Sequence, residues 1–313
     1  MMTTEQKNKL TGNLACFLAY FIFGFNIVFC KNIANTQMVS PIALFCMRSI
    51  GALLLFTLWS LFTGNREKIQ RNDLWKVALA SFLGLFLTQL SFLKAVTMAT
   101  AVDASILSIL SPIMTMIVAA IFLKDRITAH GILGLAVSAA GVLVLILNTT
   151  SVNKGADSTS IWGVLLMIVN TLSFACYVGI FKPLIQKYSV VTFMKWMFLF
   201  STLFALPFGA SDLVHVQYTQ IPAGIWLQIL YVVVFATFVS YFLIPIGQKR
   251  IAPVVVCMYS YLQPVMAMAI SLAVGLDTMT WTKALATLFV FVGVGIVNFA
   301  PAVKKRATLR KAS

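Results

Sequence analysis

The chain has 313 residues, of which 60% are hydrophobic and only 10% are charged, and its formal net charge is +15. A soluble globular protein carries charge on roughly a quarter of its residues, so this composition excludes a soluble enzyme or binding module. Long apolar runs recur along the sequence, and runs of about 20 such residues fit helices that cross a hydrocarbon core about 30 Å thick. The aromatic content is too high, and the alternation of polar and apolar residues too weak, for a porin-type barrel. The sequence therefore predicts an all-α membrane protein.

Charged residues, glycines and prolines divide the chain into ten predicted transmembrane helices joined by short connections. The opening M-M-T-T-E-Q-K-N-K-L is interpreted as the basic flank of the first helix and not as a removed signal peptide. The short connections leave no room for a soluble domain. The predicted helices are 10–30, 39–62, 74–93, 99–123, 129–147, 161–181, 190–209, 223–246, 251–275 and 281–300.

The five cysteines all fall in apolar runs, which favours buried thiols over a disulfide framework. Their spacing matches no metal-ligand motif, and no cofactor or metal is expected. These cysteines are Cys16, Cys30, Cys46, Cys176 and Cys257.

Lysine and arginine are distributed unevenly between the two sets of connections. The set that shares a side with the N-terminus includes Lys68, Lys187 and Lys249, and a basic tail follows at 301–313, whereas the opposite connections offer little more than Lys31, Lys94 and Lys154. The positive-inside rule then places both termini in the cytoplasm. The same asymmetry accounts for the net charge, so no nucleic-acid partner is expected.

The sequence repeats itself when it is shifted by 152 residues. Segment 102–116 then falls on 254–268, with Pro112 aligned on Pro264, and a shift of 151 residues aligns the earlier helices. This register predicts an internal duplication.

The two predicted repeats are 10–147 and 161–300, each with five helices. Because five is odd, the second repeat must enter the membrane from the opposite side. We therefore predict ten transmembrane helices as two inverted five-helix repeats, related by a pseudo-two-fold axis in the membrane plane. That arrangement is typical of alternating-access transporters, whose substrate site lies near the midplane between the halves.

Three motifs resemble the EamA-type branch of the drug/metabolite transporter superfamily, over roughly residues 10–300. They are F-C-M-R at 45–48, A-V-D-A-S-I-L-S-I-L-S-P at 101–112 and R-I-A-P-V-V-V-C-M-Y-S-Y-L-Q-P-V at 250–265. The resemblance implies a ten-helix bundle in the inner membrane that exports, or sometimes imports, small metabolites such as amino acids or related solutes.

Polar residues deep within the predicted helices are the candidates for lining a solute cavity, because hydrocarbon disfavours them unless they face the interior. The alternative for each is an interhelical hydrogen bond worth about 1 kcal/mol. The candidate cavity residues are Asn26, Gln89, Ser105, Ser108, Asn170, Tyr177, Tyr241, Tyr259, Ser260 and Gln263.

A second group is predicted to have structural or gating roles. Arg48 lies deep in the second helix and must pair, snorkel or face water, and a structural role is favoured over substrate contact. Lys94 and Asp103 are predicted to form a salt bridge or gate at the outer end, with plain loop solvation as the alternative. Pro112 and Pro264 should bend their helices and act as scaffold and hinge.

The sequence thus predicts a secondary transporter, not an enzyme, that exports a small neutral or zwitterionic metabolite across the inner membrane. The alternatives are a broad-specificity drug exporter, suggested by the aromatic content, and a membrane-embedded transferase, which would need clustered acidic or histidine residues. No proton-relay chain is evident, so facilitated transport, exchange and proton antiport all stay open. The expected partners are the solute and the lipid bilayer, and a homodimer is left open.

Overall fold

The computed structural model describes residues 4–64, 67–98, 110–124, 128–150, 160–263, 265–266, 269 and 281–299. Every regular element in these ranges is a helix, which confirms the all-α prediction for this part of the chain. Six helical stretches are long and apolar enough to cross a membrane, and shorter apolar helices accompany them. The six are Thr4–Asn35, Pro41–Phe62, Arg71–Ala95, Ile161–Ile180, Val190–His215 and Ala223–Arg250.

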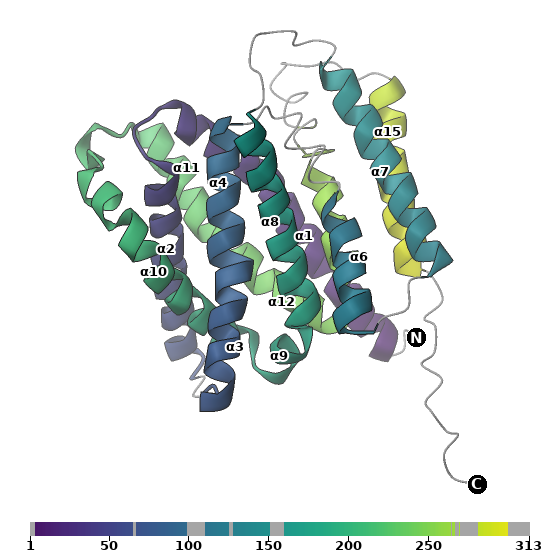
Figure 1. Cartoon of the computed structure of the whole chain (residues 1–313), viewed down its shortest axis with the longest axis horizontal. Coiled ribbons are helices and arrows are strands. Elements are labelled where there is room, and N and C mark those ends of the chain that lie inside the picture. Colours follow the sequence, from purple (N-terminus) through teal and green to yellow (C-terminus); the bar gives the residue numbers. More distant parts are fainter. Residues whose placement is uncertain are drawn as a thin grey trace.

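The first half of the chain folds close to its predicted ranges (Figure 1). The first helix is longer than expected, and the third is interrupted by a π-helical segment, η1. The elements are α1 (Thr4–Asn35), α2 (Pro41–Phe62), α3 (Arg71–Ser81), η1 (Phe82–Leu87), α4 (Thr88–Met98), α6 (Leu110–Phe122) and α7 (Ala129–Thr150).

The second half repeats this order, with a second π-helical segment, η3, and a short extra helix, α9, that the sequence did not predict. Its elements are α8 (Ile161–Ile180), α9 (Lys182–Lys187), α10 (Val190–His215), the 3₁₀-helix η2 (Tyr218–Gln220), α11 (Ala223–Val233), η3 (Val234–Val239), α12 (Ser240–Arg250), α13 (Pro253–Met258), the 3₁₀-helix η4 (Tyr259–Tyr261) and α15 (Trp281–Phe299).

Serine side chains begin three of these helices, as expected for residues that accept from the free N–H groups of a first turn. Ser40 accepts from Ala43 at the start of α2, where Pro41 also favours a helix start. Ser189 accepts from Thr192 at the start of α10, and Ser160 begins α8 in the same way. Local sequence therefore sets where these helices start.

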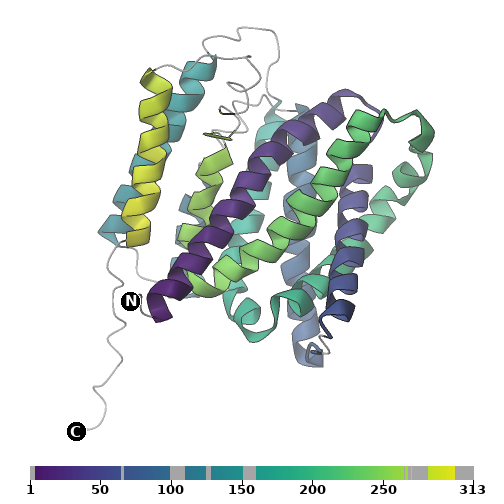
Figure 2. The same cartoon turned by 180° about the vertical axis from the view of Figure 1, so that it is seen from behind.

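Helices from the two halves pack against each other in a pattern that reflects the repeat. In Figures 1 and 2 the long helices run roughly alongside one another, and α7 and α15 form a pair at one edge of the bundle. α2 packs on α10 and α7 on α15, so each of these helices meets its own repeat equivalent. α6 packs on α13, and these two belong to the fourth and ninth predicted helices, which are equivalent in the repeat. α1 packs on α12 while α8 packs on α4, which is the same contact with the halves exchanged. This exchange is expected of two copies related by a two-fold axis.

The two π-helical segments lie at equivalent positions of the repeat. η1 begins at Phe82 and η3 at Val234, which are 152 residues apart in the sequence. Directly after each segment a hydroxyl bonds to the carbonyl five residues earlier: the Thr88 Oγ1 donates to Leu83 O at 2.6 Å, and the Ser240 Oγ donates to Phe235 O at 3.1 Å. Because π-helical turns are rare and often occur at functional sites, their recurrence in register supports both the duplication and the importance of this level of the bundle.

We expect Thr88→Val to lower the free energy of unfolding by about 1 kcal/mol, because it removes the hydroxyl that holds the irregular turn but keeps the branched shape. Thr57→Val in α2 is the matched control. Its Oγ1 also donates to a carbonyl, Leu53 O at 2.7 Å, but in a regular helix that carbonyl already accepts a backbone N–H. Equal losses of stability in both variants, measured by denaturant unfolding in detergent, would contradict a special role for the Thr88 hydroxyl.

Candidate functional site

A row of polar side chains runs along the buried face of η3 and α12. Thr237, Tyr241 and Gln248 are all buried, and their spacing of four and seven residues places them on one helical face. At 1.5 Å per residue the row is about 16 Å long. We call these three residues the polar stripe. Side chains from five other helices meet it.

The first of these is Arg48 of α2, which is only 3% exposed. Its Nε donates to the Thr237 Oγ1 at 2.9 Å, and Thr237 in turn donates to Val232 O at 2.7 Å. The irregular turn of η3 therefore anchors the arginine. Cys30 and Tyr241 lie close enough to interact with its charge.

The middle of the stripe is aromatic. The Tyr241 ring meets Phe23 of α1 and Phe198 of α10 edge to face, with ring centroids 5.9 Å and 5.6 Å apart. Its hydroxyl faces Gln89 of α4. Gln89 is 4% exposed, and neither atom of its amide reaches hydrogen-bond geometry with a described residue. Gln89 and Tyr241 are repeat equivalents, 152 residues apart, so the pair lies close to the two-fold axis.

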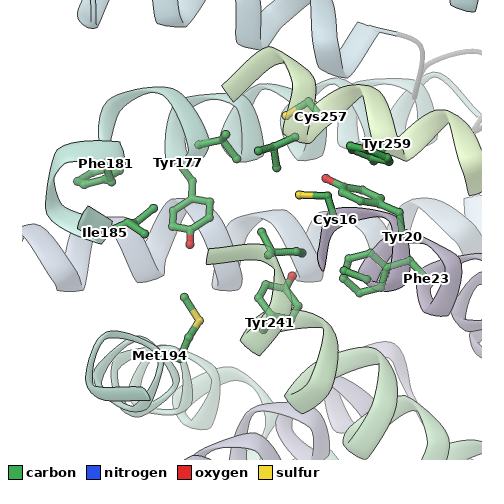
Figure 3. Close-up of a cluster of buried hydrophobic side chains, with 14 of the residues drawn as sticks. Cys16, Tyr20, Phe23, Tyr177, Phe181, Ile185, Met194, Tyr241, Cys257 and Tyr259 are labelled. Carbon is green, nitrogen blue, oxygen red and sulfur yellow. The ribbon is translucent and has the colours of Figure 1, made fainter. Parts of the chain in front are cut away.

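At the far end of the stripe, the Tyr177 hydroxyl of α8 donates to the Gln248 Oε1 at 3.3 Å. Figure 3 shows the side chains of Tyr20, Cys16 and Cys257 gathered beside Tyr241. The Tyr20 hydroxyl and the Gln248 Nε2 are enclosed without a hydrogen-bond partner among the described residues. Enclosed polar groups of this kind cost stability, so an occupant that bonds to them would be favoured.

A glycine makes room for the Tyr177 ring. A Cβ at Gly84, within η1, would lie 2.5 Å from the Tyr177 Cγ, which is too close for a carbon–carbon contact. The π-helical segment η1 therefore forms part of the wall behind this tyrosine.

The predicted site residues of the ninth helix lie in and after the 3₁₀ turn η4. The Tyr259 hydroxyl donates to Asn13 Oδ1 of α1 at 3.2 Å, and the Ser260 Oγ is enclosed without a partner among the described residues. Gln263 is half-buried, with its backbone beside α1. Because a proline at 264 cannot donate to the Ser260 carbonyl, a departure from α-helical geometry is expected at this turn.

Two predicted residues make hydrogen bonds that connect helices or turns. Asn170 donates from its Nδ2 to Thr88 O at 2.7 Å, which ties α8 to α4 beside η1. The Asn26 Oδ1 accepts from the Cys30 thiol within α1, with 3.4 Å between the atoms. Only the Asn170 contact is an interhelical hydrogen bond of the kind named as the alternative, and cavity lining stays a prediction for both residues.

The remaining predicted residues divide into two groups. Lys94 is exposed at the C-terminal part of α4, and Pro112 is buried as the third residue of α6. Ser105, Ser108, Asp103 and Pro264 lie outside the described residues, so the proposed pairing of Lys94 with Asp103 and the hinge at the prolines stay predictions.

Three residues of the site were missed from the sequence. Thr237 and Tyr20 lie deep in predicted helices, and a search for every mid-helix hydroxyl would have found them. Gln248 was placed beyond the end of the eighth helix because Lys249 and Arg250 follow it, but α12 continues to Arg250.

Polar side chains also cross-link the end of the bundle that carries the basic connections. The Asp73 carboxylate of α3 accepts from the Lys187 Nζ at 2.6 Å and from the Tyr188 hydroxyl at 2.7 Å, and the Lys249 Nζ donates to Tyr188 O. We call Asp73, Lys187, Tyr188 and Lys249 the basic-end latch. The hydrogen bond that the Lys187 Nζ donates to Asp73 raises the pKa of Lys187 above its ordinary value.

A further bond strengthens the same end. The backbone N–H of Ser189 donates to the Glu67 Oε2 at 2.8 Å. Partial burial of Glu67 disfavours its charged form, but the hydrogen bonds from Ser189 and Thr192 outweigh this and lower the pKa of Glu67. The connection between α2 and α3 is therefore fixed to the one between α8 and α10.

Comparisons with known proteins identify a family for the chain, relatives of it and a shared fold. The sequence profile described as the EamA-like transporter family matches residues 10–147 and, separately, 161–299. An uncharacterized transporter, YetK, of Bacillus subtilis is 22% identical over 71% of this chain and 67% of its own length. An uncharacterized inner membrane transporter, YicL, of Salmonella typhimurium is 25% identical over 95% of this chain and 98% of its own. A solved structure titled only as the crystal structure of a protein covers 93% of this chain and 96% of its own, with 15% identity and a TM-score of 0.73, and shows the same fold.

Proposed function

Because the chain belongs to the EamA-like transporter family, with one match in each half, we propose that it is a secondary transporter that carries a small solute between its two halves by alternating access. The observation that supports this most directly is the polar stripe. Thr237, Tyr241 and Gln248 lie inside an apolar bundle, beside polar atoms of Gln89 and Tyr20 that have no partner among the described residues. A solute or water that passes along the stripe would satisfy them.

The proposed topology is ten transmembrane helices in two inverted repeats, 10–147 and 161–300, followed by a basic tail at 301–313. The exchanged packing of α1 on α12 and α8 on α4 supports a two-fold relation between the halves, as does the equivalence of η1 and η3. With five helices in each half, this relation requires opposite orientations in the membrane. The uneven distribution of lysine and arginine supports an inner-membrane location with the basic end and both termini in the cytoplasm.

The proposed cargo is a small metabolite, moved outward, and the proposed activity involves no chemical transformation. A broad-specificity drug exporter is the second candidate, favoured by the aromatic rings of Phe23, Tyr241 and Phe198 around the middle of the stripe, since such faces accept varied apolar bodies. A metabolite transporter should discriminate between polar head groups, whereas a drug exporter should respond mainly to apolar size.

The test is solute flux in proteoliposomes against a panel of amino acids, carboxylates, nucleosides and cationic drugs. We expect saturable uptake of at least one class, and counterflow when that solute is loaded inside. Gln248→Leu should lower the flux about tenfold, because it removes the partner of the Tyr177 hydroxyl within the stripe.

The matched control is Gln228→Leu, which removes an amide that pairs with Asn32 at an exposed position. Its flux should stay close to that of the parent protein. Absence of saturable flux across the whole panel would contradict the proposed function, and equal losses in both variants would remove the stripe from the pathway.

A further inference from the structure

Arg48 is a buried cation whose charge is not balanced by the described part of the protein. Its Nε donates to Thr237, and this is its one hydrogen bond to a described residue. Neither Nη atom is recorded with a hydrogen bond to a described residue, and the whole side chain is only 3% exposed. A guanidinium does not lose its proton in a protein, and a cation inside a membrane requires a counter-charge or water.

The described groups recorded near Arg48 are uncharged. Cys30 of α1, Thr237 of η3 and Tyr241 of α12 approach it, and Gln89 of α4 lies next to Tyr241. The four acidic residues in the described ranges are all near the ends of helices. Asp212 accepts from Ser40 at one end, Asp73 and Glu67 belong to the basic end, and Glu5 lies in the first turn of α1.

We propose that the guanidinium of Arg48 binds the carboxylate of the transported solute. A planar guanidinium whose two Nη groups have no hydrogen-bond partner among the described residues matches a carboxylate with two parallel hydrogen bonds. The amide of Gln89 and the hydroxyl of Tyr241 are placed to complete the coordination. This inference rests on the proposed function and adds to it the chemical class of the solute.

The surroundings also define the rest of the solute. Phe23 and Phe198 flank Tyr241 edge to face, so the part of the solute beyond its carboxylate meets aromatic rings. No second cation is recorded beside Arg48 in the described ranges, whereas a phosphate with two charges is usually held by several basic groups. A monocarboxylate with an apolar or aromatic body therefore fits best.

The first experiment compares four probes that share a phenyl ring and differ in head group: phenylacetate, phenylacetamide, phenylphosphonate and phenethylamine. Binding to the full chain in detergent is followed by the shift in melting temperature and by tryptophan fluorescence. We expect phenylacetate to bind at least tenfold more tightly than phenylacetamide, with phenethylamine the weakest. Equal binding of phenylacetate and phenylacetamide would overturn the proposal. So would a shift in melting temperature or fluorescence with chloride that equals the shift with phenylacetate at the same concentration.

The second experiment locates the preference. Arg48→Gln should abolish the difference between phenylacetate and phenylacetamide by weakening the binding of the acid, and Arg48→Lys should keep part of the difference. Lys195→Gln is the control, since Lys195 donates to Ser60 on a different part of the α2–α10 contact and should not alter the preference. If Arg48→Gln does not fold, Thr237→Val removes the anchor of the guanidinium and should reduce the acid-to-amide ratio about fivefold.

An unchanged ratio in Arg48→Gln, or in Thr237→Val where only that variant folds, would show that Arg48 acts in packing alone and would overturn the proposal. This outcome is distinct from failure of the proposed function. If the proposed function fails, the parent protein shows no saturable flux of any solute. If only the role of Arg48 fails, saturable flux persists without a preference for carboxylates that depends on Arg48.

Discussion

Replacing Gly293 with alanine should lower the apparent melting temperature by about 5 °C or more, because the new methyl group has no space. A Cβ at Gly293 in α15 would lie 2.5 Å from Gly134 O and 2.6 Å from the Ser138 N, both of them backbone atoms of α7. Backbone cannot rotate away as a side chain can, so the two helices would have to separate. Their contact also includes the bond from the Ser138 Oγ to Val290 O at 3.2 Å.

Gly295 is the matched control for this prediction. It lies two residues further along the same helix, and a Cβ at Gly295 would meet nothing within 4 Å. Gly295→Ala should therefore leave the melting temperature unchanged or raise it slightly, since alanine favours the helix by up to about 1 kcal/mol. The measurement is thermal unfolding in detergent for both variants. Similar melting temperatures for the two would contradict the close packing of α7 on α15.

The sequence of α7 contains a signal for this contact. Gly134 and Ser138 are four residues apart, a pattern that lets helices approach closely. The shift of 152 residues aligns Gly141 with Gly293, but it does not state which helix packs on which. That depends on how the two halves combine, and an unaligned single sequence carries no direct signal for it.

Helix positions were predictable because apolar runs bounded by charge and glycine are strong local signals. The π-helical segments were not. Nothing in Phe82–Leu87 or Val234–Val239 marks a residue inserted into the helical ladder, since Thr88 and Ser240 are as compatible with regular helix. The equivalence of the two segments becomes evident from their 152-residue spacing only after the structure has shown where both of them lie.

The sequence could predict that buried polar side chains form the candidate site, but it could not predict which of them belong to it. Depth in a helix marks a polar residue as unusual, which drew attention to Gln89 and Tyr241, and the structure places these two repeat-equivalent side chains next to each other. Depth cannot separate such residues from Asn170, which bonds to the Thr88 carbonyl of a neighbouring helix. The difference lies in whether a backbone partner is within reach, and tertiary packing decides that.

Breaking the basic-end latch should open that end of the bundle. Asp73 connects three elements: its carboxylate binds the Lys187 Nζ and the Tyr188 hydroxyl, while Tyr188 also accepts from Lys249. The position equivalent to Asp73 in the second half is Ile225, so the opposite end has no copy of this carboxylate. Asp73→Asn removes the charge and should shift the equilibrium toward the state open at the basic end.

A native thiol can report this opening. Cys16 is fully buried beside Tyr20 and α12, so a polar thiol reagent can reach it only when the pathway opens. In a variant whose one remaining cysteine is Cys16, we expect Asp73→Asn to raise the labelling rate about tenfold, since a hydrogen bond to a charged group contributes roughly 1.5–3 kcal/mol. Lys187→Gln should act in the same direction. The reagent must not cross the bilayer and is added on the basic-end side of membrane vesicles.

Two variants separate this effect from general loosening. Lys76→Gln removes the other salt bridge of Asp73, which spans 3.1 Å within one helix and links no second element, so its labelling rate should stay near that of the parent. Asp212→Asn breaks the bond from the Ser40 Oγ at the opposite end, 2.5 Å long, and should not raise labelling from the basic-end side. If Asp73→Asn labels no faster than Lys76→Gln, the latch does not control access.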